Sequence, residues 1–240
     1  MPTALPSPPS RRRLVLVLGA VLVVLAAVNV ADKFGPEGTG LAVGPLVAIA
    51  LLLLARRAGL SWHDLGLSRR TLRPGLKYAV GAVTAVALLY GIGVAVPLTR
   101  PAFHDVRYHL HLGAALLTAF IVIPLGTVLL EEVAFRGVLL GLVHRHRGAM
   151  WASVTSSVLF GLWHILPSLH LAQANRAVGA ALGGRVLTVL AAVGFTALAG
   201  LLLCELRRRS GSLLAAAALH WATNGLGVLL IAGLATVRLV

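Results

Sequence analysis

The chain has 240 residues, of which 58% are hydrophobic and only 12% are charged, and its mean hydropathy is +0.92. Soluble domains carry about a quarter charged residues, so this composition excludes a soluble globular domain, a disordered tail and a coiled coil. The 21 Lys and Arg against 7 Asp and Glu give a formal charge of +14. The basic residues stand in short clusters between long apolar runs, which is typical of membrane proteins rather than of nucleic-acid-binding proteins.

Seven apolar runs are long enough to cross a bilayer as helices. They are Leu14–Val30, Gly38–Ala55, Leu76–Leu98, Leu110–Val143, Ala149–Leu166, Val186–Cys204 and Ser212–Ala235. The sequence therefore predicts an all-α, polytopic transmembrane helix bundle of about seven spans. The first run follows a basic cluster and is expected to remain as a signal anchor, with a cleaved signal peptide as the alternative.

The distribution of Lys and Arg predicts the orientation of these spans. With the N-terminus inside, 14 of the 21 fall on the inner side: Arg11, Arg12, Arg13, Arg56, Arg57, Arg69, Arg70, Arg73, Lys77, Arg145, Arg147, Arg207, Arg208 and Arg209. Six fall on the outer side: Lys33, Arg100, Arg107, Arg176, Arg185 and Arg238. The remaining one, Arg136, lies inside a span. We therefore expect the N-terminus inside and a multi-pass protein of the cell membrane.

The connection between the second and third spans, Arg56–Lys77, is expected to hold an amphipathic segment lying at the membrane interface. Its apolar residues are Leu60, Trp62, Leu65 and Leu67. Trp and Leu spaced in this way favour a position among the lipid headgroups.

Two adjacent carboxylates, Glu131 and Glu132, interrupt the fourth apolar run. A charge near the bilayer centre costs about 3 kcal/mol, so this pair calls for a function or a partner. On a helix, Arg136 stands four residues after Glu132 and neutralises it, whereas Glu131 points about 100° away. The pattern predicts one glutamate that is held and one that is free to react, and an interhelical ionic contact is the purely structural alternative.

Two histidines and an asparagine reach a similar depth on later spans. His164 lies late in the fifth run, and His220 lies in the seventh with Asn224 one helical turn further on. At about 1.5 Å per residue, Glu131, His164 and His220 all fall near the middle of the membrane. Polar groups at that depth must satisfy one another or line water, so we expect them to share a hydrated pocket.

A glutamate and a histidine that meet in such a pocket can hold and deprotonate a water molecule. An imidazole and an amide one turn apart can bind the oxyanion of a tetrahedral intermediate. This chemistry is peptide hydrolysis without a covalent nucleophile. The alternative is a zinc ion bound by Glu131, His164 and His220 with one open position, and spacing alone does not decide between the two.

The order Glu131-Glu132-x-x-x-Arg136, Phe160-x-x-x-His164 and His220-x-x-x-Asn224 resembles the CAAX protease and bacteriocin-processing (CPBP, or Abi) family of intramembrane proteases. The resemblance covers roughly residues 110–228 and implies a bacterial member. Bacterial relatives are commonly named intramembrane metalloproteases, although a glutamate-type mechanism requires no cofactor. The resemblance divides the chain into a cytoplasmic tail (1–13), variable transmembrane helices (14–109) and a catalytic core (110–240).

The resemblance also implies a role for each motif residue. Glu131 and His164 would activate the water, His220 and Asn224 would form the oxyanion site, and Glu132 with Arg136 would support the first pair. The implied partners are the lipid bilayer and a membrane-associated or lipidated peptide, with no nucleic acid. A non-proteolytic binding or immunity protein that uses the same polar cluster is the alternative function, and a proton-coupled transporter is a weaker one because no repeated half is visible.

Overall fold

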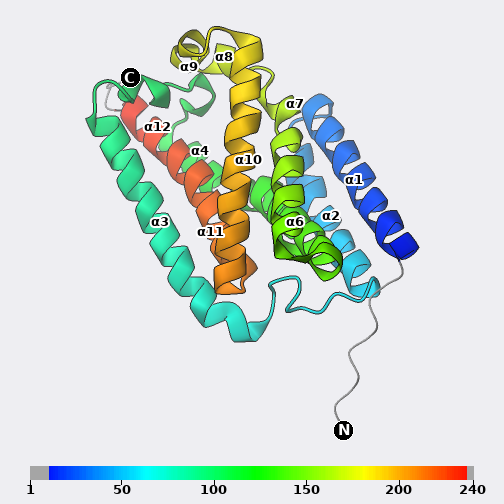
Figure 1. Cartoon of the computed structure of the whole chain (residues 1–240). Helices are drawn as coiled ribbons and strands as arrows, with labels where there is room; N and C mark the ends of the chain where they lie inside the picture. The colour runs from blue at the N-terminus through cyan, green and yellow to red at the C-terminus, as the bar shows by residue number, and fades with distance from the viewer. Residues whose placement is uncertain (1–10, 237–240) are drawn as a thin grey trace.

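The computed structural model describes residues 11–236, and within this part of the chain the regular elements are all helical, with no β-strand. The predicted all-α bundle is therefore confirmed (Figure 1). The long helices are α1 (Arg11–Phe34), α2 (Thr39–Arg57), α3 (Leu72–Ala95), α6 (Leu140–Trp163), α10 (Arg185–Ser210), α11 (Leu213–Trp221) and α12 (Gly227–Thr236). Residues 1–10 of the predicted tail and Arg238 lie outside the described residues.

Short elements join or prolong these helices. The connecting turns and helices are η1 (Arg69–Thr71), η2 (Arg100–Phe103), η3 (Val106–Tyr108), α7 (Ile165–Ser168), α8 (Leu171–Ala174) and α9 (Arg176–Ala181). The segment that leads into α6 alternates between α- and π-helical turns: α4 (Leu112–Leu117), η4 (Thr118–Val122), η5 (Pro124–Val128), α5 (Leu129–Glu132) and η6 (Val133–Leu139). Between α11 and α12 lies one further π-helical turn, η7 (Ala222–Leu226).

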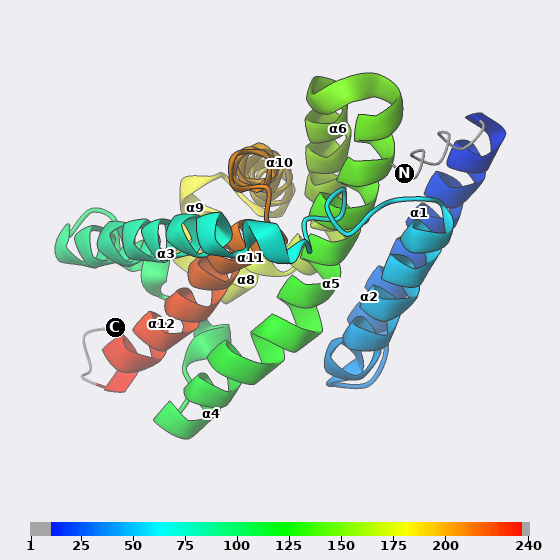
Figure 2. The ribbon, with the colours of Figure 1, turned by 90° about the horizontal axis from the view of Figure 1, so that it is seen from below.

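Six helical stretches are long and apolar enough to cross a membrane by length and composition. The longest, Leu112–Trp163, has 52 residues and turns back on itself at Gly148, where φ is 79° and ψ is 178°. Only glycine adopts such a φ readily, and the two arms then lie side by side (Figure 2). The Ser156 hydroxyl on the returning arm donates to the Phe135 carbonyl at 2.8 Å. The predicted fourth and fifth spans are these two arms.

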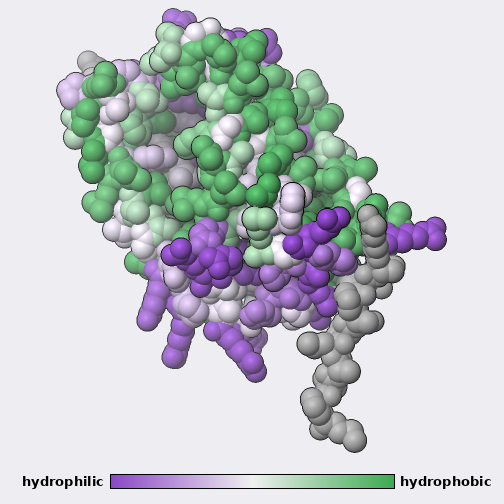
Figure 3. Space-filling view, viewed as in Figure 1, coloured by the Kyte–Doolittle hydropathy of each residue, from purple (hydrophilic) through white to green (hydrophobic). Residues whose placement is uncertain are grey.

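The loops predicted to be inner and outer gather at opposite ends of the bundle. At one end, Arg145 donates to the Gly59 carbonyl and the Leu213 amide to the Gly66 carbonyl. At the other end, Asn175 donates to the Ala102 carbonyl at 2.7 Å. Figure 3 shows hydrophilic residues concentrated at the first end, below an apolar body. We call this the arginine-rich end; the alternation of ends supports the order of the predicted spans.

The segment expected to lie at the membrane interface is partly folded into the protein. Residues 58–68 form turns rather than a helix, and Leu60 and Leu65 are fully buried in the main hydrophobic core. The buried Arg207 donates to the carbonyls of His63 and Asp64, which ties the segment to α10. The apolar spacing predicted that these side chains leave water, and the protein itself buries Leu60 and Leu65. Trp62 remains half exposed.

The helices that carry the polar residues pack at close range. An added Cβ at Gly161 on α6 would lie 2.8 Å from the Val193 carbonyl oxygen on α10, and one at Gly200 would lie 3.0 Å from Ser157. Small residues let helices approach in this way in membrane proteins. Residues of α1 and α2 share one core cluster with η6 and α6. The predicted N-terminal region and catalytic core therefore form one packed body.

Candidate active site

The two glutamates lie at the end of α5, immediately before the π-helical turn η6. Both are buried, as is Arg136, which is 0% exposed. π-helical turns inside helices recur at functional sites because they shift side chains out of the regular α-helical register. The site therefore begins with three ionisable groups removed from solvent on one helical segment.

Glu132 is held on two sides. Its Oε1 lies 3.0 Å from Nη1 of Arg136 and 2.8 Å from Nδ1 of His220, which comes from α11. The predicted pairing of Glu132 with Arg136 is confirmed, although π-helical turns follow Glu132. Beneath them, the Arg136 guanidinium lies 3.8 Å from the centre of the Phe160 ring, a cation–π contact. Glu132 thus serves as an anchor that fixes His220.

Glu131 has a freer carboxylate. Its Oε1 accepts a hydrogen bond from Trp163 Nε1 at 2.9 Å, and its Oε2 has no hydrogen-bond partner. Nε2 of His220 lies 3.8 Å from Oε2. That separation is too long for a direct hydrogen bond and suits a bridging water. The predicted division into one held and one free glutamate agrees with this geometry.

His164 caps the returning arm of α6. Its Nδ1 lies 2.8 Å from the Phe160 carbonyl oxygen, which only accepts, so Nδ1 carries the proton and Nε2 is left for another partner. The Phe160 ring makes edge contacts with both imidazoles, at 4.6 Å from His164 and 5.7 Å from His220. Among the described residues His164 forms no hydrogen bond with either glutamate. The Phe160 ring therefore stands between the two histidines.

Asn224 lies in η7, one turn after His220. His220 is buried, whereas Asn224 and its neighbour Thr223 are exposed. The Tyr90 hydroxyl on α3 donates to the Thr223 carbonyl at 2.6 Å, which satisfies an acceptor of the π-helical turn. Exposed amide groups at membrane depth are costly unless they face water. Asn224 meets this condition because it lines a cavity.

The cavity has a volume of about 590 Å³, and His164 and Asn224 both line it. Its other polar walls include Ser168, Thr188 and Thr196. Glu131, Glu132 and His220 are not among its lining residues, so they form a buried layer behind it. The structure thus assembles the predicted residues in two layers: a buried carboxylate–imidazole layer, and a cavity wall with one imidazole and one amide.

The zinc site that the sequence left open as an alternative does not fit this arrangement. Within residues 11–236 no three His, Cys, Asp or Glu side chains lie close enough together to hold a metal ion. Glu131 and His220 approach each other, but His164 lies on the cavity wall, with the Phe160 ring between it and His220.

Sequence reasoning gave no site role to Trp163 or Tyr90, and it gave Phe160 none beyond its place in a motif. The aromatic ring of Phe160 was part of a recognised motif, but its position beneath Arg136 depends on how two arms of one hairpin pack. The Trp163 donor adjoins His164 in sequence, and only the fold aims it at Glu131. Nothing in the local sequence of Tyr90 indicates its contact with η7.

Residues 113–226 match the protein family described as Rce1-like, type II CAAX prenyl endopeptidase. This segment runs from α4 to η7 and includes every residue of both layers described above. No curated protein and no solved structure matches the chain.

Proposed function

Because residues 113–226 belong to the Rce1-like CAAX prenyl endopeptidase family, we propose that Glu131 activates a water molecule for peptide-bond hydrolysis within the membrane. The observation that carries this proposal is the Glu131 carboxylate, which is buried, oriented by Trp163 and left with one unpartnered oxygen 3.8 Å from an imidazole nitrogen. A carboxylate placed in this way can accept a proton from water as a general base.

The other groups divide the remaining work. His164, whose Nε2 is uncommitted, helps to hold the water. The Asn224 amide, together with His220 when its Nε2 carries a proton, binds the oxygen of the carbonyl as it gains negative charge. Glu132 and Arg136 do not contact the substrate in this scheme; they position His220 through its Nδ1. The reaction is balanced by transfer of the water proton from Glu131 to the departing amine.

The substrate class that this site supports is a membrane-associated peptide. The cavity lies among helices whose outer surfaces are strongly apolar, and its walls combine small hydroxyl groups with aromatic and aliphatic side chains. A peptide backbone needs such hydrogen-bonding groups when it leaves water. The alternative function, binding without hydrolysis, would use the same cavity but would not need a carboxylate with a free oxygen.

The decisive variant is Glu131→Gln, which keeps the side-chain shape and the acceptor for Trp163 but removes the base. We expect cleavage of a degenerate peptide library by the purified protein to fall at least about 100-fold, with folded yield and peptide binding retained. A binding protein would show no cleavage in the wild type and little effect of the change.

Metal content separates the two hydrolytic schemes. We expect the active wild-type protein to contain no stoichiometric zinc and to keep its activity in a chelator, and Asn224→Ala to lose about 100- to 1000-fold in kcat, as is typical of an oxyanion donor. Glu132→Asp is a useful control because it keeps a carboxylate beside Arg136 and leaves Glu131, the proposed base, unchanged. Zinc that is lost together with activity would replace the glutamate scheme by a metal-dependent one.

A further inference from the structure

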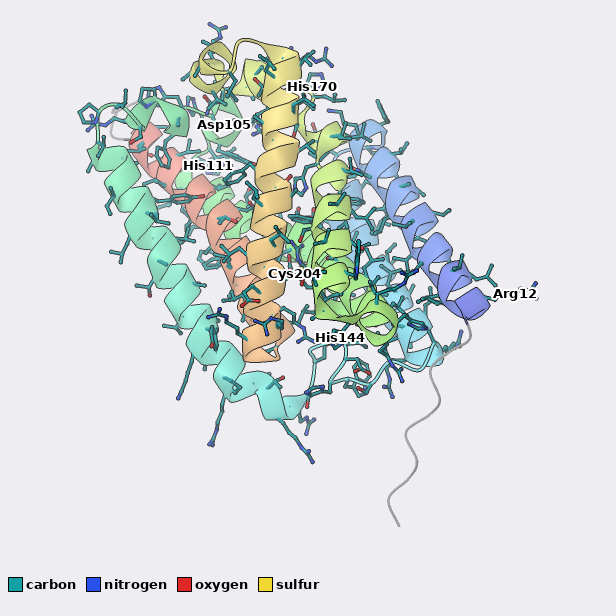
Figure 4. The ribbon with its side chains drawn as sticks, viewed as in Figure 1. Arg12, Asp105, His111, His144, His170 and Cys204 are labelled. Atoms are coloured by element: carbon teal, nitrogen blue, oxygen red, sulfur yellow. The ribbon has the colours of Figure 1, made fainter. Side chains whose placement is uncertain are left out.

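The cavity that holds His164 and Asn224 opens toward one end of the bundle. Its walls include residues of the α3–α4 connection, namely Ala102, Phe103, Asp105, Arg107 and Tyr108, and residues of the α7–α9 region, namely Ser168, Leu171, Val178 and Leu182. Both segments lie at the end opposite the arginine-rich end. Figure 4 shows Asp105, His111 and His170 at that end, and His144 at the other.

The arginine-rich end has a hollow of its own, which does not reach the site. It measures about 240 Å³, is lined by His63, His144 and Arg207 among others, and shares no lining residue with the larger cavity. Phe135, Val138 and Leu139, which follow the glutamates along η6 toward this end, are at most 1% exposed. Packed side chains therefore separate the glutamates from the arginine-rich end.

The larger cavity is also open sideways, between α3 and α10. Tyr90 on α3 and Ala191 and Phe195 on α10 line it, and Phe195 is 72% exposed. Figure 1 shows α3 and α10 diverging away from the arginine-rich end, and Figure 3 shows the same face hollowed between them, with paler, less apolar residues inside. The exposed Thr223 and Asn224 lie on the far wall of this opening.

The site limits the conformation of the segment that can react. A helical segment keeps its carbonyls hydrogen-bonded within the helix, whereas an extended segment can present a carbonyl to Asn224 on the cavity wall. At the rim, Arg107 is paired with Asp105 at 2.6 Å. The hydrogen bonds from Arg107 to Asp105 raise the pKa of the guanidinium. The pair therefore stays ionic, and each charge neutralises the other.

We propose that the peptide substrate reaches the site from the half of the membrane opposite the arginine-rich end, entering between α3 and α10 as an extended apolar segment. This inference rests on the proposed hydrolytic function only where an experiment measures cleavage. By the charge bias of the loops, this half is the outer one. The substrate class is then a peptide presented on the outer face of the membrane rather than one delivered from the side of the arginines.

The first experiment places a peptide library on one side of the membrane at a time. The Cys204→Ala protein carrying Arg209→Cys is reconstituted into phosphatidylcholine–phosphatidylglycerol vesicles, and an impermeant maleimide reports which molecules expose the arginine-rich end. We expect cleavage only of peptides on the side of the membrane opposite the cysteine introduced at position 209. Cleavage only on the arginine side would overturn the route and leave the protease assignment intact.

A second readout does not depend on hydrolysis. In the Glu131→Gln, Cys204→Ala background, we expect apolar peptides added on the outer side to protect Ala191→Cys from a permeant maleimide, and not to protect Leu190→Cys. Leu190 is the matched control because it adjoins Ala191, is 61% exposed and does not line the cavity. Equal protection at both positions, or protection only from the arginine side, contradicts the proposal even if the wild type proves inactive.

The same pair of positions tests the opening itself. Ala191→Trp is expected to raise KM for apolar peptides roughly tenfold with little change in kcat, because it obstructs entry without touching the reacting groups. Leu190→Trp should leave both constants unchanged. Equal kinetics for the two variants would show that peptides bypass the space between α3 and α10.

Discussion

At the scale of single residues, the site depends on how two adjacent carboxylates are made unequal. Glu132 is surrounded by Arg136 and His220, whereas Glu131 receives one hydrogen bond from Trp163 and keeps one oxygen free. A buried charge with partners is tolerated and one without them is costly. The partners of Glu132 therefore offset the cost of burying its charge. Glu131 has fewer partners, and we propose that its free oxygen serves the reaction.

The Glu132–Arg136 pair predicts a specific pattern of rescue. Arg136→Ala should destabilise the fold by about 3–5 kcal/mol, because it leaves a buried carboxylate without its cation. Adding Glu132→Gln should recover much of the folded yield, measured by thermal unfolding in detergent, but not the activity, since His220 loses its anchor. Additive losses in the double variant would mean that Arg136 stabilises another group.

Trp163 predicts an effect on both rate and stability. Trp163→Phe keeps the aromatic packing and removes the donor to Glu131, so we expect kcat to fall about tenfold, since hydrogen bonds to charged groups contribute about 1.5–3 kcal/mol. The unfolding temperature should also fall, because a buried Glu131 oxygen loses its donor, whereas KM should change little. Trp151→Phe, at a half-exposed position, is the control; a matching loss in that variant would assign the effect to general packing.

At the scale of elements, the hairpin of two arms around Gly148 and the close packing of α6 on α10 bring the motifs together. The returning arm carries Phe160, Trp163 and His164, and Gly161 and Gly200 let α10 pack closely against this arm. The π-helical turn after His220 carries Thr223 and Asn224, which line the cavity. Helix packing therefore shapes the candidate site as much as the polar residues do.

Gly161 makes this dependence measurable. Gly161→Ala places a Cβ 2.8 Å from a carbonyl oxygen and 2.9 Å from the Ala197 Cβ on α10, so we expect a loss of about 1–3 kcal/mol in stability and reduced activity. Gly194→Ala on α10 meets nothing within 4 Å and should be neutral, or stabilising by up to about 1 kcal/mol. Similar effects of the two changes in chemical or thermal unfolding would refute the packing argument.

At the scale of the whole molecule, charge and shape are polarised along one axis. The arginine-rich end is sealed from the buried carboxylate–imidazole layer, and the cavity opens laterally toward the other end. Under the proposed route, peptides reach the site from that open side only. The orientation of the bundle in the membrane therefore selects the substrates.

The predicted orientation is checked by cysteine labelling in cells that express the Cys204→Ala protein. Glu37→Cys, exposed between α1 and α2, should react with an impermeant maleimide from outside. Arg209→Cys, at an exposed side chain of the arginine-rich end, should react only after the membrane is opened. The reverse pattern would place the arginines outside and invert the expected side of substrate entry.

The sequence by itself determined the helical class, the order of the apolar segments and the identity of the polar residues. It could do so because apolar length and isolated charges in hydrocarbon are local properties with large energies. It also predicted the Glu132–Arg136 contact, since four residues along one helix fix that geometry. The family match over residues 113–226 agrees with the resemblance that the same motifs carry.

Only the tertiary structure decided which groups meet across helices. His220 turns its Nδ1 to Glu132, Trp163 reaches Glu131, and His164 faces the cavity with Asn224. It also showed that Leu60 and Leu65 are buried by protein rather than by lipid. These outcomes depend on the packing of residues that are distant in sequence, and hydrophobicity reports that a side chain leaves water without reporting what replaces the water.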